Sequence, residues 1–362
     1  NPVNDYLAPF LEEAFAPLVA RGFLRIVRGG SEAGALLCSH GRIDEIHVTG
    51  SDATHDAIVW GKGAEAAERR ARGTPRVAKR VTSELGNVTP VIVVPGRWSD
   101  AALRFHAENV ATQIVQNGGF NCNAAKVLVL DAAWTQRGAF LEALRGVLRG
   151  LPPRRAWYPG ARSRFERFVA AHAGAEVLGT PRGDDLPPAL LTGLDPGRTD
   201  TLAFREESFC AVAGVVELPG GGAAGFLANA VAFANDVLFG TLCASVIVDP
   251  ATRSALGGAL DSAIDALAVN HWPALGFALG GTTWGAYPGH TLAEVGSGIG
   301  WVHGAWLLDR PEKSVVEGPF LAWPQPPWFV THRRAHEVAR RLAAHEAAPS
   351  LANVPGIAWQ AL

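Results

Sequence analysis

The sequence has no methionine, and its cysteines are not spaced as in a metal site or a disulfide framework. The cysteine spacing argues against both kinds of site. Its four cysteines, Cys38, Cys122, Cys210 and Cys243, lie far apart, with no CxxC motif and no Cys/His pair at metal-ligand spacing. We therefore expect reduced thiols and no bound metal. The missing methionines and the abrupt start at Asn1, inside sequence that already resembles a folded region, lead us to expect that an N-terminal part precedes this chain or that methionine positions are left out of it.

Long apolar runs and basic clusters are also lacking. No run reaches the roughly 18 apolar residues that a membrane span needs, and no basic stretch followed by an apolar one opens the chain as in a signal peptide. The 32 basic and 34 acidic residues nearly balance, and no Lys/Arg stretch alternates with aromatic residues. We therefore expect a cytoplasmic protein with neither a membrane nor a nucleic acid as partner.

What the sequence does contain is an alternation of helical and strand-like segments. Its 362 residues, 48% of them hydrophobic, are enough for two domains with buried cores. Alternating helices and strands are typical of a parallel sheet covered by helices, so the fold class is α/β. The predicted strands are 22–30, 43–51, 76–85, 89–96, 126–133, 212–218 and 243–249, and the predicted helices are 10–20, 32–40, 52–61, 99–115, 226–236 and 332–347, with 253–270 continuing the alternation.

Cys122 is the candidate nucleophile. It lies in "QNGGFNCNAAKVLVL", where glycines and asparagines leave room for a substrate and supply polar donors. A cysteine attacks a carbonyl carbon as its thiolate, which requires a lowered pKa and access. The alternative is a buried structural thiol, which most free cysteines are and which we accept for the other three. Glu84, at the end of a strand in "SELGNVTP", has the position of a general base.

These two segments together resemble the aldehyde dehydrogenase superfamily. The general-base motif of that family reads Glu-Leu-Gly-Gly-x-x-Pro, and here it is Glu84 to Asn87 with Pro90. The nucleophile of the family follows in the setting Asn-x-Gly-x-x-Cys-x-Ala, which corresponds to the residues from Asn117 to Ala124. The order and the spacing of the two motifs also agree.

Further segments are similar to family elements in the same order. "HVTGSDATHDAIV" resembles a strand, turn and helix whose amides after Gly50 and Ser51 would meet the pyrophosphate of the cofactor, although a Gly-Ser turn before a helix is also ordinary capping. "REESFCAV" implies Glu207 on the nicotinamide ribose and Phe209 beside the nicotinamide ring, and Leu85 completes the implied cofactor set. "ANDVLFGTLCASVIVD" and "VNHWPALGFALGG" extend the resemblance over about residues 1–285.

The departures from the family pattern indicate a divergent member. Asn87 replaces the second glycine of the general-base motif, Gly118 and Phe120 replace two glutamines, and Cys210 with Ala211 replaces Gly-Pro. The first strands of the family, its oxyanion asparagine and the lysine for the adenosine ribose would precede Asn1 or be missing. The cofactor is therefore NAD or NADP, with the choice open.

The resemblance implies a domain organisation. We expect residues 1–85 to be the remainder of a Rossmann-type coenzyme-binding domain, residues 86–295 an α/β catalytic domain, and residues 296–362 a C-terminal segment. That segment contains "EKSVVEGPF", a possible strand for pairing subunits, and an extra helix after His332. A homodimer or homotetramer is expected.

The implied activity is oxidation of an aldehyde to a carboxylic acid with hydride transfer to NAD(P)+. Cys122 would form a thiohemiacetal and then a thioester, and Glu84 would activate the water that hydrolyses it. The alternatives are a CoA-acylating or acyl-reducing relative, a non-catalytic homologue and a cysteine hydrolase. The presence of Glu84 argues against the first, the presence of both residues against the second, and no histidine is indicated as a partner of Cys122 for the third. Phe120, Trp272 and Phe277 suggest only an apolar aldehyde.

Overall fold

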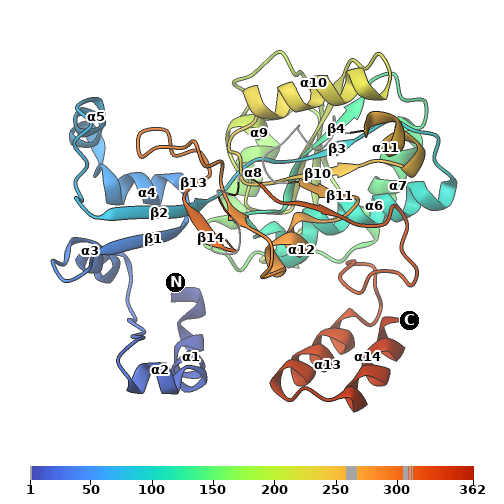
Figure 1. Cartoon of the computed structure of the whole chain (residues 1–362). Helices are drawn as coiled ribbons and strands as arrows, with labels where there is room; N and C mark the ends of the chain where they lie inside the picture. Colours follow the sequence, from blue (N-terminus) through green and yellow to red (C-terminus); the bar gives the residue numbers. More distant parts are fainter. Residues whose placement is uncertain (1, 258–266, 305–308, 310, 312) are drawn as a thin grey trace.

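A computed structural model describes residues 2–257, 267–304, 309, 311 and 313–362, and an eight-stranded sheet forms its centre (Figure 1). The strand order is β15-β11-β10-β3-β4-β9-β8-β6, and all neighbours are parallel except β8 and β6. Parallel neighbours need crossover connections, which the intervening helices supply. The strands are β3 (Thr89–Val93), β4 (Ala125–Asp131), β6 (Ala175–Val177), β8 (Ala189–Leu194), β9 (Val212–Leu218), β10 (Ala244–Ile247), β11 (Leu267–Val269) and β15 (Val315–Glu317).

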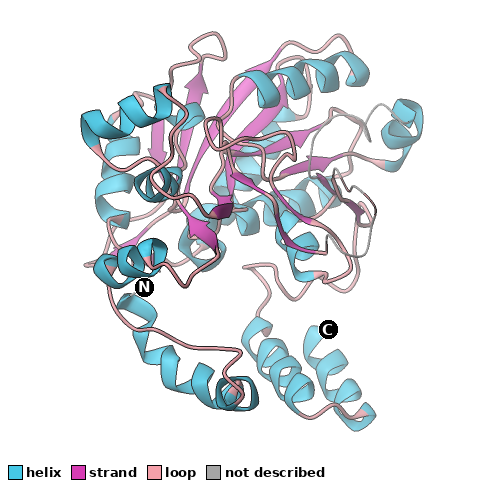
Figure 2. Cartoon of the chain, turned by 60° about the vertical axis from the view of Figure 1, so that its left-hand side comes forward, coloured by secondary structure: helices cyan, strands magenta, loops and turns pink. Residues whose placement is uncertain are grey.

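Helices cover both faces of this sheet and divide the core in two (Figures 1 and 2). On one face lie α6 (Asp100–Val115) and α7 (Arg137–Gly150), which bury Phe140 and Leu144 against the sheet. On the other face lie α9 (Leu202–Arg205) and α10 (Ala223–Asp236), which bury Phe204 and Phe226. Every residue of β3 and β4 is buried, which is why both strands are nearly continuous apolar runs in the sequence.

A second, smaller sheet lies beside the first. It consists of β1 (Glu45–Gly50), β2 (Arg80–Leu85) and β13 (Gly298–Ile299). β1 and β2 run parallel, and β13 joins β2 antiparallel. The accompanying helices are α3 (Ser31–Ser39), α4 (Asp52–Val59) and α5 (Gly63–Ala71). A separate apolar cluster that includes Val59 and Trp60 forms the core of this part.

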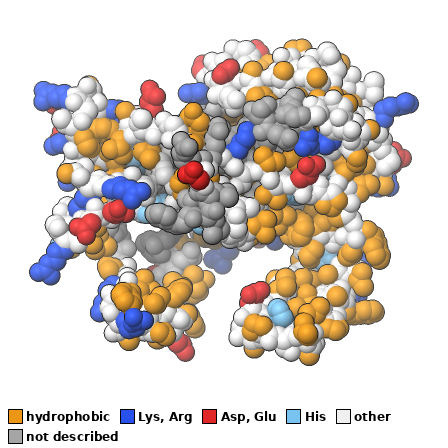
Figure 3. Space-filling view, in the orientation of Figure 1, with side chains coloured by type: hydrophobic (Ala, Val, Ile, Leu, Met, Phe, Trp, Pro, Cys, Tyr) orange, Lys and Arg blue, Asp and Glu red, His pale blue; other side chains and the backbone are white. Residues whose placement is uncertain are grey.

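Helices at both ends of the chain stand away from the two sheets (Figure 1). They are η1 (Pro2–Leu7), α1 (Ala8–Ala14) and α2 (Ala16–Ala20) at the start, and α13 (Ala335–Ala347), η5 (Leu351–Asn353) and α14 (Val354–Ala361) at the end. Their apolar side chains, such as Phe10 and Trp359, are largely exposed, as the orange areas of Figure 3 show. None of the described helices is long and apolar enough to cross a membrane.

The remaining short elements connect these parts. They are η2 (Gln116–Gly119), β5 (Arg154–Arg155), α8 (Ala161–Ala170), β7 (Asp185–Leu186), α11 (Pro250–Leu256), α12 (Pro273–Ala278), β12 (Trp284–Gly285) and β14 (Trp301–His303).

The predicted α/β class is confirmed, but two local predictions are wrong. Residues 22–30 form no strand, because Phe23 and Val27 face solvent and the segment pairs with no described strand. The helix expected over 10–20 is interrupted at Phe15, where Pro17 in the following turn cannot donate a backbone hydrogen bond. Part of the segment 253–270 lies outside the described residues.

The three-part division of the chain at residues 85 and 295 stays a prediction. Two strand pairings concern the predicted C-terminal part. β13 lies in the predicted C-terminal segment and pairs with β2 of the first part. The strand in "EKSVVEGPF" is β15, and in this structure it pairs with β11 of its own chain. The pairing of subunits through this strand also stays a prediction.

The division of the core leads to a first prediction. Phe140 is fully buried in α7, so Phe140→Ala removes a large side chain from a packed site and should lower the free energy of unfolding by about 3–5 kcal/mol. Phe10→Ala, at an exposed position of α1, should change it by less than about 0.5 kcal/mol. Guanidinium titration of both variants checks this, and equal losses would contradict the packing described.

Candidate active site

The register of β1 and β2 brings the predicted site residues of the smaller sheet together. Gly50 lies opposite Leu85, and Thr49 lies opposite Glu84, at the carboxyl ends of both strands. Ligands of open α/β sheets bind beyond the carboxyl ends of parallel strands. The Gly50-Ser51 turn and the general-base motif, which are 34 positions apart in sequence, therefore border the same space.

Cys122 and Glu84 are in direct contact. The Cys122 thiol donates a hydrogen bond to Oε1 of Glu84 at 3.2 Å, and Glu84 is buried. Burial raises the pKa of the Cys122 thiol well above its ordinary value, and the neighbouring Glu84 carboxylate raises it further. In this arrangement the sulfur keeps its proton, and an acceptor for that proton is already at hydrogen-bonding distance.

A left-handed turn delivers Cys122 to this position. After α6 ends, Asn117, Gly118 and Gly119 have φ angles of 52°, 67° and 78°. A Cβ on Gly119 would lie 2.5 Å from the carbonyl carbon of Cys210, so this position accepts no side chain. We interpreted the glycines as providing room for a substrate, whereas here their role is to let the backbone turn sharply and pack closely.

Glu207 lies beside the same motif. A Cβ on Gly86 would lie 2.0 Å from Oε2 of Glu207, which shows how closely the carboxylate packs against the backbone that follows Glu84. Burial raises the pKa of Glu207 to about 7, opposed by the positive charges of Lys126 and Arg164. Its neighbour Glu206 is exposed and forms an ion pair with Arg167, which holds the pKa of Glu206 below its ordinary value.

Lys126 is a site-lining residue that the sequence analysis missed. It is buried at the start of β4, and its ammonium group donates to the Gly119 carbonyl at 3.0 Å. Burial lowers the pKa of Lys126, while the Glu207 carboxylate acts in the opposite direction. The available signal was a single charged residue at the head of the otherwise apolar "KVLVL".

Phe209 belongs to an aromatic group behind the turn. Its ring centroid lies 4.7 Å from that of Tyr158 and 6.0 Å from that of Phe120, and the Arg164 guanidinium lies 5.9 Å from its ring. Phe209 has a φ of 40°, unusual for a non-glycine residue. Trp157 also joins this group, and no motif of its segment indicated this.

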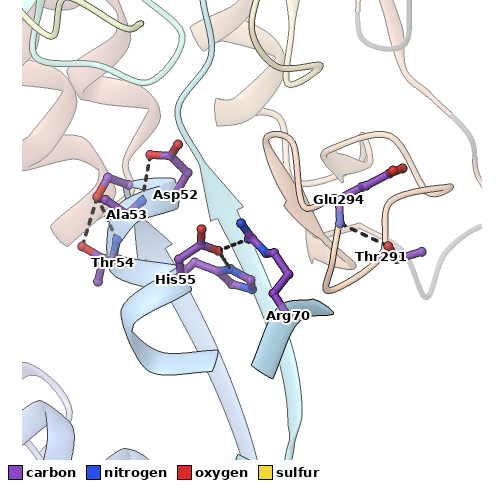
Figure 4. Close-up of polar contacts among 9 residues, drawn as sticks. Asp52, Ala53, Thr54, His55, Arg70, Thr291 and Glu294 are labelled. Atoms are coloured by element: carbon purple, nitrogen blue, oxygen red, sulfur yellow. Dashed lines mark hydrogen bonds and ion pairs between the residues drawn. The ribbon is translucent and has the colours of Figure 1, made fainter. Parts of the chain in front are cut away.

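The turn at Gly50 is a capped helix start. Ser51 accepts a hydrogen bond from the Thr54 amide at 3.2 Å, so the capping interpretation is confirmed. Figure 4 shows that Asp52, in the first turn of α4, accepts a bond from the Ala53 amide at 2.8 Å, so a carboxylate already lies where the helix would attract an anion. A Cβ on Gly50 would meet nothing closer than 3.9 Å, and its φ is ordinary, so the chain itself does not require glycine there.

Asn87 explains one departure from the family motif. Its amide donates to the Cys243 carbonyl at 3.1 Å, and its Oδ1 accepts from the Thr89 hydroxyl at 2.9 Å. The asparagine thus ties the start of β3 to the start of β10, next to Cys122.

Of the three aromatic residues expected on the substrate side, Phe120 is buried in the aromatic group with Phe209. The indole of Trp272 donates to the carbonyl of Asn123, next to Cys122, at 2.9 Å, whereas Phe277 is partly exposed and packs on Trp284. Trp284, which the sequence analysis did not single out, donates from its indole to Oε1 of Glu84 at 3.2 Å. Among the residues with described positions, no group of three or more His, Cys, Asp or Glu could hold a metal ion.

Comparison with known proteins shows what the chain is similar to. Residues 3–156 match the model of the aldehyde dehydrogenase family. The chain is 31% identical over 131 residues to 4-trimethylaminobutyraldehyde dehydrogenase of Oryzias latipes, covering 36% of this chain and 23% of that protein. It is 36% identical over 105 residues to 4-trimethylaminobutyraldehyde dehydrogenase B of Danio rerio, covering 29% and 18%.

Solved structures match over a larger part of the chain. Gamma-glutamyl-gamma-aminobutyraldehyde dehydrogenase from Burkholderia cenocepacia has a TM-score of 0.59 at 24% identity, over 77% of this chain and 53% of that one. Betaine aldehyde dehydrogenase from Staphylococcus aureus, solved in complex with NAD+, has a TM-score of 0.57 at 19% identity, over 77% and 52%. The resemblance inferred from the sequence is thus confirmed: residues 3–156 match the family model, and the chain shares the fold of these solved aldehyde dehydrogenases. It spans about half the length of these solved chains, and the sequence matches cover less than a quarter of the curated relatives.

The turn at Gly119 generates a prediction about the site. Gly119→Ala places a methyl group against the Cys210 backbone in a left-handed conformation, so it should lower the free energy of unfolding by about 1–3 kcal/mol. It should also change the rate at which iodoacetamide alkylates Cys122. Gly146→Ala, in the middle of α7 with open space around it, should be neutral or stabilising by up to about 1 kcal/mol. Similar effects of the two changes on denaturant unfolding would contradict the proposed constraint.

Proposed function

We propose that this chain oxidises an aldehyde to a carboxylic acid with NAD+ or NADP+ as hydride acceptor. The observation that carries the proposal is the 3.2 Å hydrogen bond between Cys122 and Glu84, in a related fold and beside the Glu207 carboxylate. A nucleophilic thiol within reach of a carboxylate base is the arrangement that covalent catalysis on a carbonyl requires.

The first step is the addition of Cys122 to the aldehyde. Because burial keeps the thiol protonated, its proton must leave as the sulfur attacks, and Glu84 Oε1 is placed to accept it. The sulfur–carbon bond forms, and the carbonyl π electrons become the oxyanion of a thiohemiacetal. A nicotinamide held at this site would accept the hydride that leaves this carbon, and the loss of that hydride leaves a thioester on Cys122.

Hydrolysis of the thioester uses Glu84 a second time, after the proton that it took from the thiol has passed to solvent and the carboxylate is restored. A water that loses its proton to the Glu84 carboxylate adds to the thioester carbon, the carbon–sulfur bond breaks, and the sulfur leaves as thiolate. The carboxylic acid is released, and protonation of the sulfur restores the thiol. Glu84 is buried, and its Oε1 lies 3.2 Å from the sulfur.

Two observations fit a dinucleotide to this site. Oε1 of Glu207 is buried and has no hydrogen-bond partner in the described part of the chain, so ribose hydroxyls would satisfy an acceptor that is otherwise left over. A Cβ on Gly50 would meet only ordinary van der Waals contacts, at 3.9 and 4.0 Å, so no tight packing at Gly50 blocks a phosphate near the α4 N-terminus. Gly50, Ser51, Leu85, Glu207 and Phe209 are therefore proposed to hold the cofactor. The negative charge of the Asp52 carboxylate, which lies in the first turn of α4, should repel the pyrophosphate and weaken its contact with the helix N-terminus.

The other classes are less well supported by the site. Transfer of the acyl group to CoA has no use for Glu84 as a base, and a non-catalytic homologue has no use for the Cys122–Glu84 pair. The substrate is proposed to be a small-molecule aldehyde, and association into a homodimer or homotetramer stays a prediction.

The proposal is tested at the nucleophile. Cys122→Ala should abolish NAD(P)H formation with acetaldehyde, hexanal and benzaldehyde, because Cys122 is the cysteine whose thiol has a described hydrogen bond to Glu84. Cys38→Ala, in the smaller sheet's apolar cluster, should retain activity. Absorbance at the NAD(P)H band measures both. If the Cys122→Ala variant is active and a Cys243→Ala variant is inactive, Cys243 is the nucleophile and the proposal is wrong.

The raised pKa of Glu207 predicts a pH dependence of cofactor binding. A carboxylate accepts hydrogen bonds from ribose hydroxyls better than its protonated form does, and the ionised fraction of a group with a pKa of about 7 rises about tenfold between pH 6 and pH 8. The Kd for NAD+ should therefore fall by up to about tenfold over this range.

Calorimetric titration of two matched variants isolates this effect. Glu207→Gln should bind NAD+ more weakly at pH 8 and lose the pH dependence. Glu206→Gln, which alters only the surface ion pair with Arg167, should keep it. If Glu207→Gln keeps the pH dependence and Glu206→Gln loses it, the contact of Glu207 with the ribose is ruled out.

A further inference from the structure

We propose that Trp284 is a positioning residue that holds the Glu84 carboxylate toward the sulfur of Cys122 while the thioester is hydrolysed. This inference rests on the proposed function and adds to it a residue outside the two motifs. Trp284 lies 200 positions after Glu84 in the sequence, and the structure brings the two together.

The geometry shows one carboxylate oxygen with two donors. Oε1 of Glu84 accepts from the Trp284 indole at 3.2 Å and from the Cys122 thiol at 3.2 Å. Trp284 is 4% exposed and packs in one apolar cluster with Leu242 and Cys243, against which Cys122 also lies. The indole therefore borders both residues of the proposed catalytic pair.

The two donors differ in what happens to them during the reaction. When an acyl group is attached to Cys122, the thiol proton is gone, and the sulfur can no longer donate to Glu84. The Trp284 indole keeps its hydrogen throughout, because it is a donor only. In the acyl-enzyme it is thus the donor that continues to fix the carboxylate at the place where a water must be activated.

The surroundings hold the indole in place. Trp284 opens β12, which pairs with β14, with Trp284 opposite His303. The ring of Phe277 meets the Trp284 ring edge-on, at 5.3 Å between centroids and 74° between planes. His303 in turn hydrogen-bonds the carbonyls of Phe277 and Thr282, at 2.9 and 3.2 Å. The Phe277 ring and the apolar cluster with Leu242 and Cys243 thus hold the Trp284 indole in a position suited to orienting the Glu84 carboxylate.

Packing alone would not require tryptophan at this position. A phenylalanine ring would fill most of the same apolar space and would keep the edge-on contact with Phe277, but it has no N–H group. The substitution Trp284→Phe therefore removes the proposed interaction while retaining most of the packing.

The experiment separates acylation from hydrolysis and does not use the cofactor. p-Nitrophenyl acetate is added to the full chain, acetylation of Cys122 is followed by peptide mass spectrometry, and the loss of the acetyl group is then timed. In Trp284→Phe, acetylation should stay within about twofold, because the thiol itself still holds Glu84. Loss of the acetyl group should slow by about tenfold or more, the effect of removing one hydrogen bond to a charged group.

Two controls distinguish positioning from general damage. Trp98→Phe removes the N–H of another buried indole, one with no partner in the described part of the chain, and should leave both rates unchanged. In a Glu84→Gln background, Trp284→Phe should slow the loss of the acetyl group no further, because the indole acts through Glu84. Disturbed packing would instead add its effect to that of Glu84→Gln.

The outcomes separate this inference from the proposed function. If Glu84→Gln slows acetyl loss but Trp284→Phe does not, or if the two effects are additive, the role of Trp284 is overturned and the function stands. If Glu84→Gln does not slow it, or if Cys122 is not acetylated in the unmodified chain, the proposed function fails and the role of Trp284 fails with it.

Discussion

The contact between Cys122 and Glu84 is the interaction on which the rest of the site depends, because it joins two separately built sheets. Glu84 lies one residue before the end of β2 in the smaller sheet, and Cys122 precedes β4 in the middle of the larger one. A 3.2 Å hydrogen bond between them requires the register of β1 and β2, the left-handed turn at 117–119 and the packing of both sheets to be correct together. The distance between Cys122 and Glu84 therefore depends on how both sheets are folded and packed.

The buried part of the site contains groups of both charges close to the Cys122 thiol. Glu84 and Glu207 place two carboxylates next to a thiol, and a buried thiolate beside them would be unfavourable. Lys126 and Arg164 supply positive charge from the other side. Proton transfer from Cys122 to Glu84 moves a charge within this group and adds none to the site as a whole. A direct hydrogen bond between donor and acceptor is suited to such a transfer.

The sequence predicted local structure correctly where a feature depends only on the residues of one segment. The alternation of helices and strands, the Ser51 cap and the buried runs of β3 and β4 follow from periodicity and residue type, and the structure agrees with them. The strand predicted over residues 22–30 does not form. The segment has residues typical of a strand, but it has no described partner strand to pair with, and its apolar side chains are exposed. The glycines before Cys122 were correctly singled out, but their role in backbone conformation depends on the later contact with Cys210.

By itself the sequence determined the fold class, the family resemblance and the candidate residues in two short motifs, since spacing along the chain preserves these. Only the tertiary structure decided what lies around them. Lys126, Asn87 and Trp284 reach the site through contacts that no spacing encodes, the last across 200 positions. Hydrogen bonds and burial depend on which strands become neighbours, and that is settled by packing of the whole chain.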